Sequence, residues 1–378
     1  MKKTFSSLGL PDFLTKNLER IGYPSPYLIQ EKVIPVVMGN RDVLGIAPTG
    51  SGKTASFALP ILAKLLNTDT LNSRNRYPHV LVMVPTRELA DQVKAVFTQL
   101  SSGLPQKIKT IALYGGVSVN PQMIALQGCQ VVVATPGRLL DLIECNALKL
   151  DDVNTLVIDE ADKLLNLGFQ DEMKAILNLI PLMRQNLLFS ATLNKDVKAI
   201  NELVLNQPEV INLSEIVEEL PPITQKAYRV KSADKGPLLR QILNDAKDMQ
   251  VLIFTSSIYK ADHVADKLRK NNIPATAIHG KKSQGARTEA LALFKAGKIR
   301  VLVATDLLGR GIDIKHLPMV INYELPRSPK DYVHRIGRTG RAGEPGMAIS
   351  FIDPEEEHHF GIIMKKTKQE IERLTYEK

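Results

Sequence analysis

The chain is predicted to have an α/β fold with two tandem domains, each a mostly parallel sheet with helices on both faces. Three observations support this prediction. Short runs of branched apolar residues alternate with longer helical segments, which is typical of parallel βαβ units. The alternation occurs twice along the 378 residues. Polar motifs follow the strand-like runs, at the carboxyl ends where open α/β sheets bind ligands.

The expected strands are short and almost entirely apolar, as strands buried on both faces should be. In the first half they lie at residues 43–47, 80–84, 131–134, 156–158 and 187–189. In the second half they lie at residues 251–254, 275–278, 301–304, 320–322 and 348–351.

A linker is expected between the halves. Residues 206–224 contain three prolines and several glutamates without sustained periodicity, which is typical of a connecting segment. We therefore predict domains at residues 1–213 and 223–378, joined by a linker at 214–222. The tail from Met364 is rich in lysine and glutamate, and we expect it to end in a short solvated helix.

Composition excludes several classes of protein. With 44% hydrophobic and 24% charged residues the chain is globular, and no apolar stretch approaches the roughly 20 residues of a membrane-spanning helix. Cys129 and Cys145 lack the spacing of a zinc site or of a disulfide framework, so both are expected to be reduced apolar fillers. A cytoplasmic protein is the expectation.

Positive charge is concentrated in the second half. The net charge is +9, and residues 1–212 carry 21 Lys and Arg against 19 Asp and Glu, which leaves +7 for the remainder. A basic surface favours a polyanionic partner, because neutralised phosphates release counterions. Charge alone does not separate this interpretation from an ordinary basic surface.

A phosphate-binding loop is predicted at the end of the first strand. Gly50 and Gly52 would let backbone N–H groups turn towards phosphate oxygens, and the next helix adds its positive N-terminus. Lys53 would reach the β and γ phosphates, and the Thr54 hydroxyl would bind Mg²⁺. The full set of loop contacts is Ala47, Pro48, Thr49, Gly50, Ser51, Gly52, Lys53 and Thr54. The alternative is a glycine-rich turn before a core helix.

An acidic tetrad and two arginines complete the predicted chemistry. Asp159 follows a buried strand and would hold Mg²⁺ through water, while Glu160 would orient or activate the attacking water. Arg338 and Arg341 would bridge γ-phosphate oxygens and stabilise the charge that develops there. The alternatives are a solvated turn and a surface basic loop. Together with Lys53, these residues predict an enzyme that cleaves a nucleotide phosphoanhydride.

With Asp159-Glu160-Ala161-Asp162 and Ala47-x-Thr-Gly-x-Gly-Lys-Thr54, nearly the whole chain resembles the DEAD-box RNA helicases of superfamily 2. Its size is similar to that of compact bacterial members such as the RhlE type. The resemblance implies two RecA-like domains that close around ATP and RNA. It implies RNA-stimulated ATP hydrolysis coupled to local duplex unwinding or to remodelling of RNA–protein complexes.

The segment from Gly22 to Gln30 is similar to the family's glutamine motif. By this resemblance, Gln30 reads the adenine edge, Phe5 stacks on the base and Asp313 binds the ribose, so ATP is the expected nucleotide. Tyr27-Leu28 stands where the family usually has Thr-Pro.

Further motifs of the family imply contacts to single-stranded or short duplex RNA without sequence preference. Ser190 and Thr192 lie in the motif that couples hydrolysis to strand separation. The implied RNA contacts are Pro85, Thr86, Arg87, Gly116, Thr135, Pro136, Gly137, Arg138, Thr255, Gly280, Gln284, Arg287, Thr305 and Arg310. Two alternatives are an ATP-gated RNA clamp and a DNA translocase.

Overall fold

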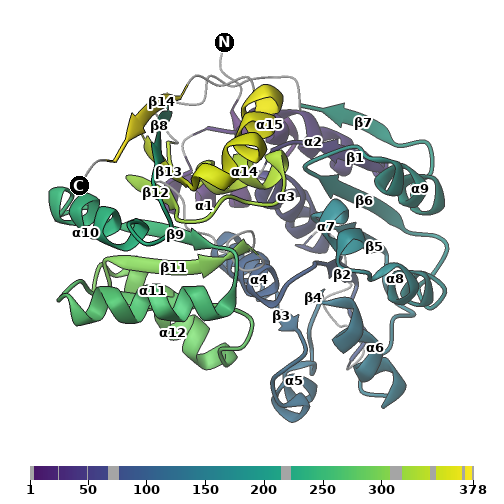
Figure 1. Ribbon diagram of the computed structural model, residues 1–378. Coiled ribbons are helices and arrows are strands. Elements are labelled where there is room, and N and C mark those ends of the chain that lie inside the picture. Colours follow the sequence, from purple (N-terminus) through teal and green to yellow (C-terminus); the bar gives the residue numbers. More distant parts are fainter. Residues whose placement is uncertain are drawn as a thin grey trace. The chain divides into compact units, whose positions relative to one another are not determined.

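The chain divides into two compact units, Met1–Ile216 and Val217–Lys378 (Figure 1). This computed structural model describes residues 4–23, 25–48, 50–66, 76–213, 223–306, 317–340, 346–367 and 371–376. Four of the predicted site residues, Thr49, Arg310, Asp313 and Arg341, lie outside these ranges, as does the expected linker at 214–222.

The first unit is built around a seven-stranded sheet in the order β3-β4-β2-β5-β6-β1-β7. Its strands are β1 (Val43–Ile46), β2 (Val80–Met83), β3 (Thr110–Leu113), β4 (Val131–Ala134), β5 (Thr155–Ile158), β6 (Gln185–Ser190) and β7 (Glu209–Asn212), and every pairing is parallel. Its helices are η1 (Phe5–Leu8), α1 (Asp12–Arg20), α2 (Leu28–Met38), α3 (Lys53–Leu66), α4 (Arg87–Ser101), α5 (Val119–Ala125), α6 (Pro136–Glu144), α7 (Ala161–Asn166), α8 (Gln170–Leu177) and α9 (Lys195–Val204).

The second unit repeats the plan with the order β10-β11-β9-β12-β13-β8-β14, again with parallel pairings only. Its strands are β8 (Ile223–Arg229), β9 (Val251–Thr255), β10 (Ala275–Ile278), β11 (Val301–Thr305), β12 (Met319–Asn322), β13 (Gly346–Ile352) and β14 (Glu372–Thr375). Its helices are α10 (Lys235–Asp245), α11 (Ile258–Lys270), α12 (Gln284–Lys295), α14 (Pro329–Ile336), η3 (Pro354–Glu356) and α15 (Glu357–Thr367). The predicted α/β class is confirmed.

Four strands that the sequence did not predict lie at or near sheet edges. Strand β7 lies in the segment 206–224, just before the expected linker at 214–222, and it pairs with β1. Its side chains are not uniformly buried. Strand β14 shows that the prediction of a helical end to the tail was wrong. Residues up to Thr367 complete α15, and β14 then pairs in parallel with β8. The edge strands β7 and β14 mix polar and apolar side chains, so they lack the apolar runs that reveal central strands. The other two missed strands differ, since β3 is mostly buried and β8 lies one strand in from the edge.

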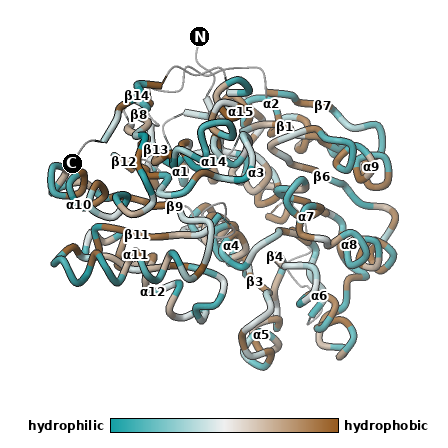
Figure 2. Tube along the Cα trace, in the orientation of Figure 1, coloured by the Kyte–Doolittle hydropathy of each residue, from teal (hydrophilic) through white to brown (hydrophobic). Residues whose placement is uncertain are grey.

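Helices bury both faces of each sheet. In the first unit, Val43 belongs to an apolar cluster with α2, α3 and α4, whereas the next residue, Leu44, belongs to a cluster with α6, α7, α8 and α9. Successive strand residues point to opposite faces, so short apolar runs feed both clusters. Figure 2 shows the same pattern in the second unit: β11 is hydrophobic along its length, whereas hydrophilic and hydrophobic residues alternate along α11 and α12.

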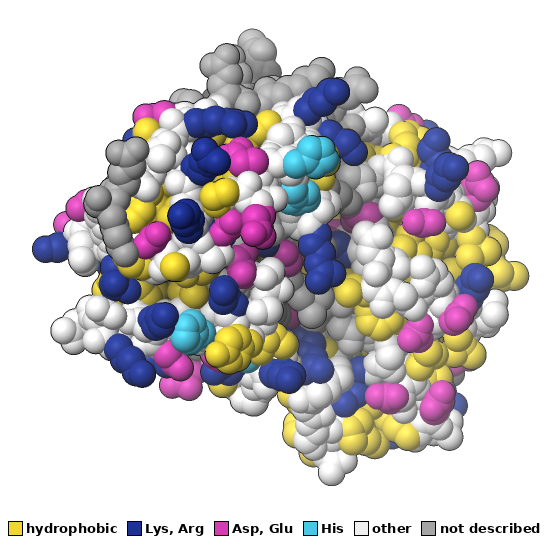
Figure 3. Space-filling model, viewed as in Figure 1, with side chains coloured by type: hydrophobic (Ala, Val, Ile, Leu, Met, Phe, Trp, Pro, Cys, Tyr) yellow, Lys and Arg dark blue, Asp and Glu magenta, His cyan; other side chains and the backbone are white. Residues whose placement is uncertain are grey.

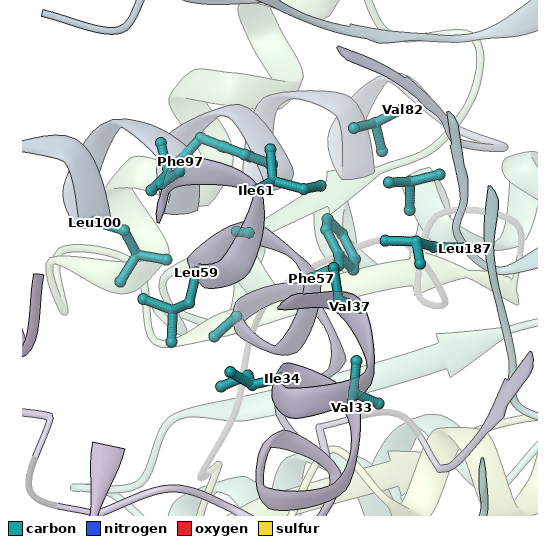
Figure 4. Packing of buried hydrophobic residues seen from close by; sticks show 14 of the residues in the cluster. Val33, Ile34, Val37, Phe57, Leu59, Ile61, Val82, Phe97, Leu100 and Leu187 are labelled. Atoms are coloured by element: carbon teal, nitrogen blue, oxygen red, sulfur yellow. The ribbon is translucent and has the colours of Figure 1, made fainter. Parts of the chain in front are cut away.

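Phe57 of α3 packs at the centre of the first cluster. Its ring centroid lies 6.2 Å from that of Phe97 and 5.3 Å from that of Phe189, and all three side chains are fully buried. Figure 4 shows Phe57 close to Leu187 of β6. Burying a side chain of this size stabilises the fold by roughly 1.5–3 kcal/mol. The packing holds α3, and with it Lys53 at its start, against the sheet.

Gly45→Ala should destabilise the first unit. A Cβ at Gly45 would lie 2.6 Å from Cδ1 and Cε1 of the Phe189 ring, which is fully buried in the apolar cluster. Overpacking of this kind costs about 1–3 kcal/mol, measurable by urea unfolding. Phe189→Leu removes the ring from this space. The double variant should therefore lose less free energy of unfolding than the sum of the losses in the two single variants. Strict additivity of the two losses would show that movement of other atoms, and not of the Phe189 ring, accommodates the added Cβ.

Candidate active site and nucleic-acid contacts

The carboxyl ends of the strands bring the predicted catalytic residues of the first unit to one edge of the sheet. Ile46 pairs in register with Ser190, and the Ala47 N–H donates to the Ser190 carbonyl oxygen at 3.1 Å. Asp159 leaves β5 with its N–H donating to the Met83 carbonyl oxygen at 3.0 Å. The parallel register therefore places the phosphate loop, the acidic tetrad and the end of β6 side by side.

Lys53 is the first residue of α3, and its side chain folds back into the phosphate loop. Its Nζ donates to the carbonyl oxygens of Ala47 at 2.6 Å and of Pro48 at 2.9 Å. Gly50 and Gly52 have φ values of 87° and 90°, a left-handed conformation that glycine adopts without strain. Burial lowers the Lys53 pKa, although the charge of Asp159 opposes the shift. The loop thus presents a cation and a helix N-terminus, which suits phosphate binding.

The acidic tetrad turns sharply between β5 and α7. Glu160 has φ 52°, which is uncommon for a residue with a side chain and is often found at functional sites. The Glu160 N–H donates to Asp159 Oδ1 at 2.9 Å, and Lys163 Nζ forms an ion pair with Glu160 Oε2 at 2.6 Å. Burial, followed by the charge of Glu160, raises the pKa of Asp159 to about 6, while Lys53 opposes the shift.

A chain of hydrogen bonds joins the tetrad to the end of β6. Thr192 Oγ1 donates to Asp162 Oδ2 at 3.0 Å. Ser190 Oγ donates to the Thr192 carbonyl oxygen at 2.7 Å and accepts from the Thr192 N–H at 3.2 Å. Ser190 and Asp162 are almost completely buried. These bonds connect the tetrad directly to the segment after β6.

The glutamine predicted to read the base is fixed to the phosphate loop. Gln30 Oε1 accepts from the Tyr27 N–H at 2.9 Å, and Gln30 Nε2 donates to the Gly52 carbonyl oxygen at 3.2 Å. A Cβ at Gly52 would lie 2.6 Å from Gln30 Nε2, so the loop needs glycine there. Tyr27, the first residue of the Tyr27-Leu28 pair that replaces the usual Thr-Pro, is the N-cap of α2 and has an extended conformation.

Phe5, which was predicted to stack on the base, lies in the apolar cluster of the first unit and is 6% exposed.

The predicted nucleic-acid contacts of the first unit lie at the starts of helices, except Gly116, which lies between β3 and α5. Thr86 caps α4, and its Oγ1 accepts from the Leu89 N–H at 3.3 Å. Gly116 has φ 74°, and a Cβ there would lie 2.2 Å from the Arg87 guanidinium, so these two residues are in contact. Arg138 donates to the Val117 carbonyl oxygen at 3.0 Å. The remaining predicted contacts are Pro85, which precedes α4, and Thr135, Pro136 and Gly137, which begin α6.

In the second unit, the predicted contacts also follow strand ends. Thr255 and Thr305 pair in register at the ends of β9 and β11. Gly280 follows β10 and is exposed, and Arg287 contacts Gln284 in the first turn of α12. These five residues lie after the neighbouring strands β10, β11 and β9 or at their ends, and at the start of α12, which follows β10 in the chain.

Asp262 of α11 fastens the loop after β10. It accepts from His279 Nε2 at 2.9 Å and forms an ion pair with Lys282 Nζ at 3.2 Å. Burial raises the pKa of Asp262, but the hydrogen bonds from His279 and Lys282 outweigh it and hold that pKa below its ordinary value. The start of α11 and the loop carrying Gly280 are thereby held together.

Arg335 is a buried residue beside the predicted sites that the sequence interpretation missed. It is 2% exposed, and it contacts Asp306 Oδ1 at 2.5 Å and Oδ2 at 2.8 Å. It also donates to Asn322 Oδ1 at 3.0 Å and lies over the Phe254 ring, 5.0 Å from its centroid. The sequence offered two signals: Arg335 follows His334 in the arginine motif, and Asp306 follows Thr305. Neither signal shows that the side chains of Arg335 and Asp306 meet.

Arg338, which was predicted to reach the γ-phosphate, lies just after α14 and is 8% exposed. Its carbonyl oxygen accepts from the Leu317 N–H at 3.2 Å, and its own N–H donates to the Arg335 carbonyl oxygen at 3.2 Å. The backbone on which Arg338 sits is thus tied to the residue that binds Asp306.

Arg335→Met should destabilise the second unit by up to about 3 kcal/mol, because it leaves the half-buried Asp306 without its guanidinium. Arg335→Lys should be intermediate, since an ammonium cannot make the forked contact. Arg327→Met is the matched control, because Arg327 is exposed. Thermal unfolding of the full chain measures all three, and equal effects of Arg335→Met and Arg327→Met would contradict a structural role for the network.

Family models match most of the chain. A DEAD/DEAH box helicase model matches residues 27–200, and a model for the helicase conserved C-terminal domain matches residues 234–343. Among the described residues, no helix is long and apolar enough to cross a membrane.

Curated relatives and solved structures agree with these models. The DEAD-box ATP-dependent RNA helicase CshA of Geobacillus kaustophilus is 39% identical over 372 residues, covering 98% of this chain and 78% of that protein. The ATP-dependent RNA helicase CshA of Listeria monocytogenes is 39% identical, covering 98% of this chain and 70% of that protein. Similarity to the RhlE type stays a prediction.

Dbp5 of S. cerevisiae, solved with RNA and ADP BeF3, is 30% identical with a TM-score of 0.86, covering 99% of this chain and 96% of that one. A structure of Mss116p bound to ssRNA and AMP-PNP is 28% identical with a TM-score of 0.86, covering 100% of this chain and 80% of that one. The two units match the tandem RecA-like domains of such helicases. With family models over residues 27–200 and 234–343 and relatives 39% identical over 98% of its length, the chain belongs to the family of DEAD-box helicases.

Proposed function

We infer that the chain is an ATP-dependent RNA helicase, in which RNA-stimulated ATP hydrolysis drives local duplex unwinding or remodelling of RNA–protein complexes. The observation that carries this inference is the meeting of Lys53, Asp159 and Glu160 at one sheet edge, with Thr192 bonded to the tetrad. The CshA relatives are named ATP-dependent RNA helicases, and Dbp5 was solved with RNA and ADP BeF3. The cytoplasm stays the predicted location.

The nucleotide is proposed to lie across the phosphate loop, with adenine at Gln30. The amide of Gln30 is already held by Tyr27 and Gly52, so the side chain is preorganised to read a base edge with one donor and one acceptor. Lys53 would exchange its two carbonyl partners for phosphate oxygens. Phe5 would stack on the base only if its ring leaves the cluster in which it now packs.

Thr54 and Asp159 are proposed to hold Mg²⁺. A hydroxyl and one carboxylate suit this ion, which keeps several waters and takes its other ligands from substrate phosphates. When bound, the ion neutralises charge on the phosphates. Among the described residues no cluster of three His, Cys, Asp or Glu side chains could hold a metal, which agrees with a site completed by the nucleotide.

Glu160 is proposed to orient the attacking water. Glu160 follows β5, and its left-handed backbone conformation sets the direction of its side chain. The ion pair with Lys163 fixes one of its carboxylate oxygens. Lys163 is therefore a positioning residue. Asp162 takes no part in proton transfer in this scheme, since it is bonded to Thr192.

RNA is proposed to cross the strand ends of both units, held through its backbone and 2′-hydroxyls. The contacts are the threonines, glycines and arginines that follow strands in each unit, with Arg310 added from outside the described residues. Such groups bind phosphate and sugar without reading sequence. We therefore propose that single-stranded or short duplex RNA of any sequence is the partner.

Closure of the two units is proposed to couple the ligands. Arg338, Arg341 and Asp313 belong to the second unit, whereas the phosphate loop belongs to the first, so the complete nucleotide site requires both. We propose units at residues 1–213 and 223–378 with 214–222 as the linker. Each ligand that favours the closed state strengthens binding of the other. The bonds from Asp162 through Thr192 to Ser190 give the first unit a route for this coupling.

ATP hydrolysis should be strongly stimulated by single-stranded RNA and lost in Glu160→Gln, which keeps the shape of the side chain but not its charge. The measurement is phosphate release with RNA, with matched DNA and without nucleic acid, followed by strand separation of a short duplex. Equal stimulation by DNA would contradict RNA selectivity and favour a DNA translocase. RNA-dependent hydrolysis with long RNA dwell times and no strand separation would favour an ATP-gated clamp.

Affinity for Mg²⁺-bound nucleotide should fall as pH drops below about 6, because the Asp159 pKa is raised to about 6. Above that pH the carboxylate is ionised and can hold the ion, whereas below it the carboxyl is protonated. Titration of a fluorescent nucleotide across this range measures the effect. Asp159→Asn should bind weakly at every pH, and a wild-type affinity that is flat through this window would contradict the assignment.

A further inference from the structure

An exposed aromatic pair lies at the start of α11. Tyr259 is 77% exposed, the ring centroids of Tyr259 and His263 are 5.9 Å apart, and their planes differ by 13°, so the rings are stacked. The residues are one helical turn apart, and Lys267 follows at the next turn on the same side. The stripe of Tyr259, His263 and Lys267, called here the α11 stripe, presents an aromatic platform followed by a cation.

The α11 stripe begins at the proposed RNA path. Helix α11 starts three residues after Thr255, which pairs in register with Thr305. Asp262 bonds His279 and Lys282, so the first turns of the helix are also fastened to the loop that carries Gly280. The platform is therefore anchored beside contacts from β9, β11 and β10.

The charge of α11 suits an anion. The helix carries Lys260, Lys267, Arg269 and Lys270 against two aspartates. Both aspartates are paired with cations, Asp262 as described and Asp266 with Arg269. Figure 3 shows Lys and Arg side chains gathered over this face of the second unit. A phosphate backbone that follows the stripe would meet net positive charge.

The exposed ring is not explained by packing of the fold. Tyr259 is the most exposed aromatic side chain among the described residues. Bases of single-stranded RNA stack on tyrosine and histidine rings, and every base offers such a face. A base on the outer face of Tyr259 would extend the existing ring stack.

We propose that the α11 stripe is a further RNA-binding site, which holds the strand beyond the backbone contacts at the sheet edge by stacking one base on Tyr259. The site rests on the proposed function and deepens it. It would favour long single strands over short ones without reading sequence. Lys267 would bind a phosphate of the same segment.

The test is RNA affinity in the presence of a non-hydrolysable ATP analogue, measured by fluorescence anisotropy with a short and a longer oligouridylate. Tyr259→Ala should weaken binding of the longer strand about five- to tenfold, from loss of one stacked base, and leave the short strand unchanged. Tyr259→Phe should retain affinity. Tyr259→Leu, which keeps apolar area without an aromatic ring, should behave like Tyr259→Ala.

Removing single bases from the longer RNA identifies stacking directly. One abasic position should weaken wild-type binding, and Tyr259→Ala should then add no further loss, because both changes remove the same interaction. Ile362→Ala, an exposed apolar residue of α15 in the same unit, is the matched control and should have no effect.

The outcomes separate this proposal from the helicase assignment. If wild-type protein binds RNA and the Tyr259 variants bind the longer strand equally well, the α11 stripe is not an RNA site, and a protein partner becomes its expected occupant. A loss that is independent of the abasic position would also overturn the stacking proposal. Absence of RNA-stimulated hydrolysis in the wild-type protein would instead overturn the proposed function.

Discussion

Parallel pairing of every described strand is the constraint on which the rest of the structure depends. It sends all carboxyl ends of a sheet to one edge, so residues far apart in the sequence meet there. Ala47 and Ser190 are joined by a backbone hydrogen bond, and Thr255 lies in register with Thr305. Parallel sheets must also be buried on both faces, which explains the short, wholly apolar central strands.

The predicted active site of this DEAD-box helicase holds buried charge. Burial lowers the Lys53 pKa and raises that of Asp159, and each charge opposes the shift of the other. Lys53 satisfies its donors on loop carbonyls, and Glu160 is held by Lys163. These contacts hold the loop and the tetrad together within the first unit.

The two units use the same architecture for different tasks. In the first, a glycine-rich loop and an acidic turn occupy strand ends. In the second, a forked contact from Arg335 to Asp306 ties α14 to the end of β11, and Asp262 ties α11 to the loop after β10. Charged side chains thus fix the strand ends of the second unit, where the phosphate loop has no counterpart among the described residues.

The sequence by itself determined the fold class and the central strands, because buried strands depend on local composition and spacing. It also predicted the motifs of the active site. Edge strands β7 and β14 were missed, since their side chains are mixed and only pairing with a neighbour makes them strands. The contacts from Thr192 to Asp162, Gln30 to Gly52 and Arg335 to Asp306 were decided by tertiary structure alone. Each joins residues on separate elements that the packing of helices and strands brings within hydrogen-bonding distance, and no local pattern encodes that distance.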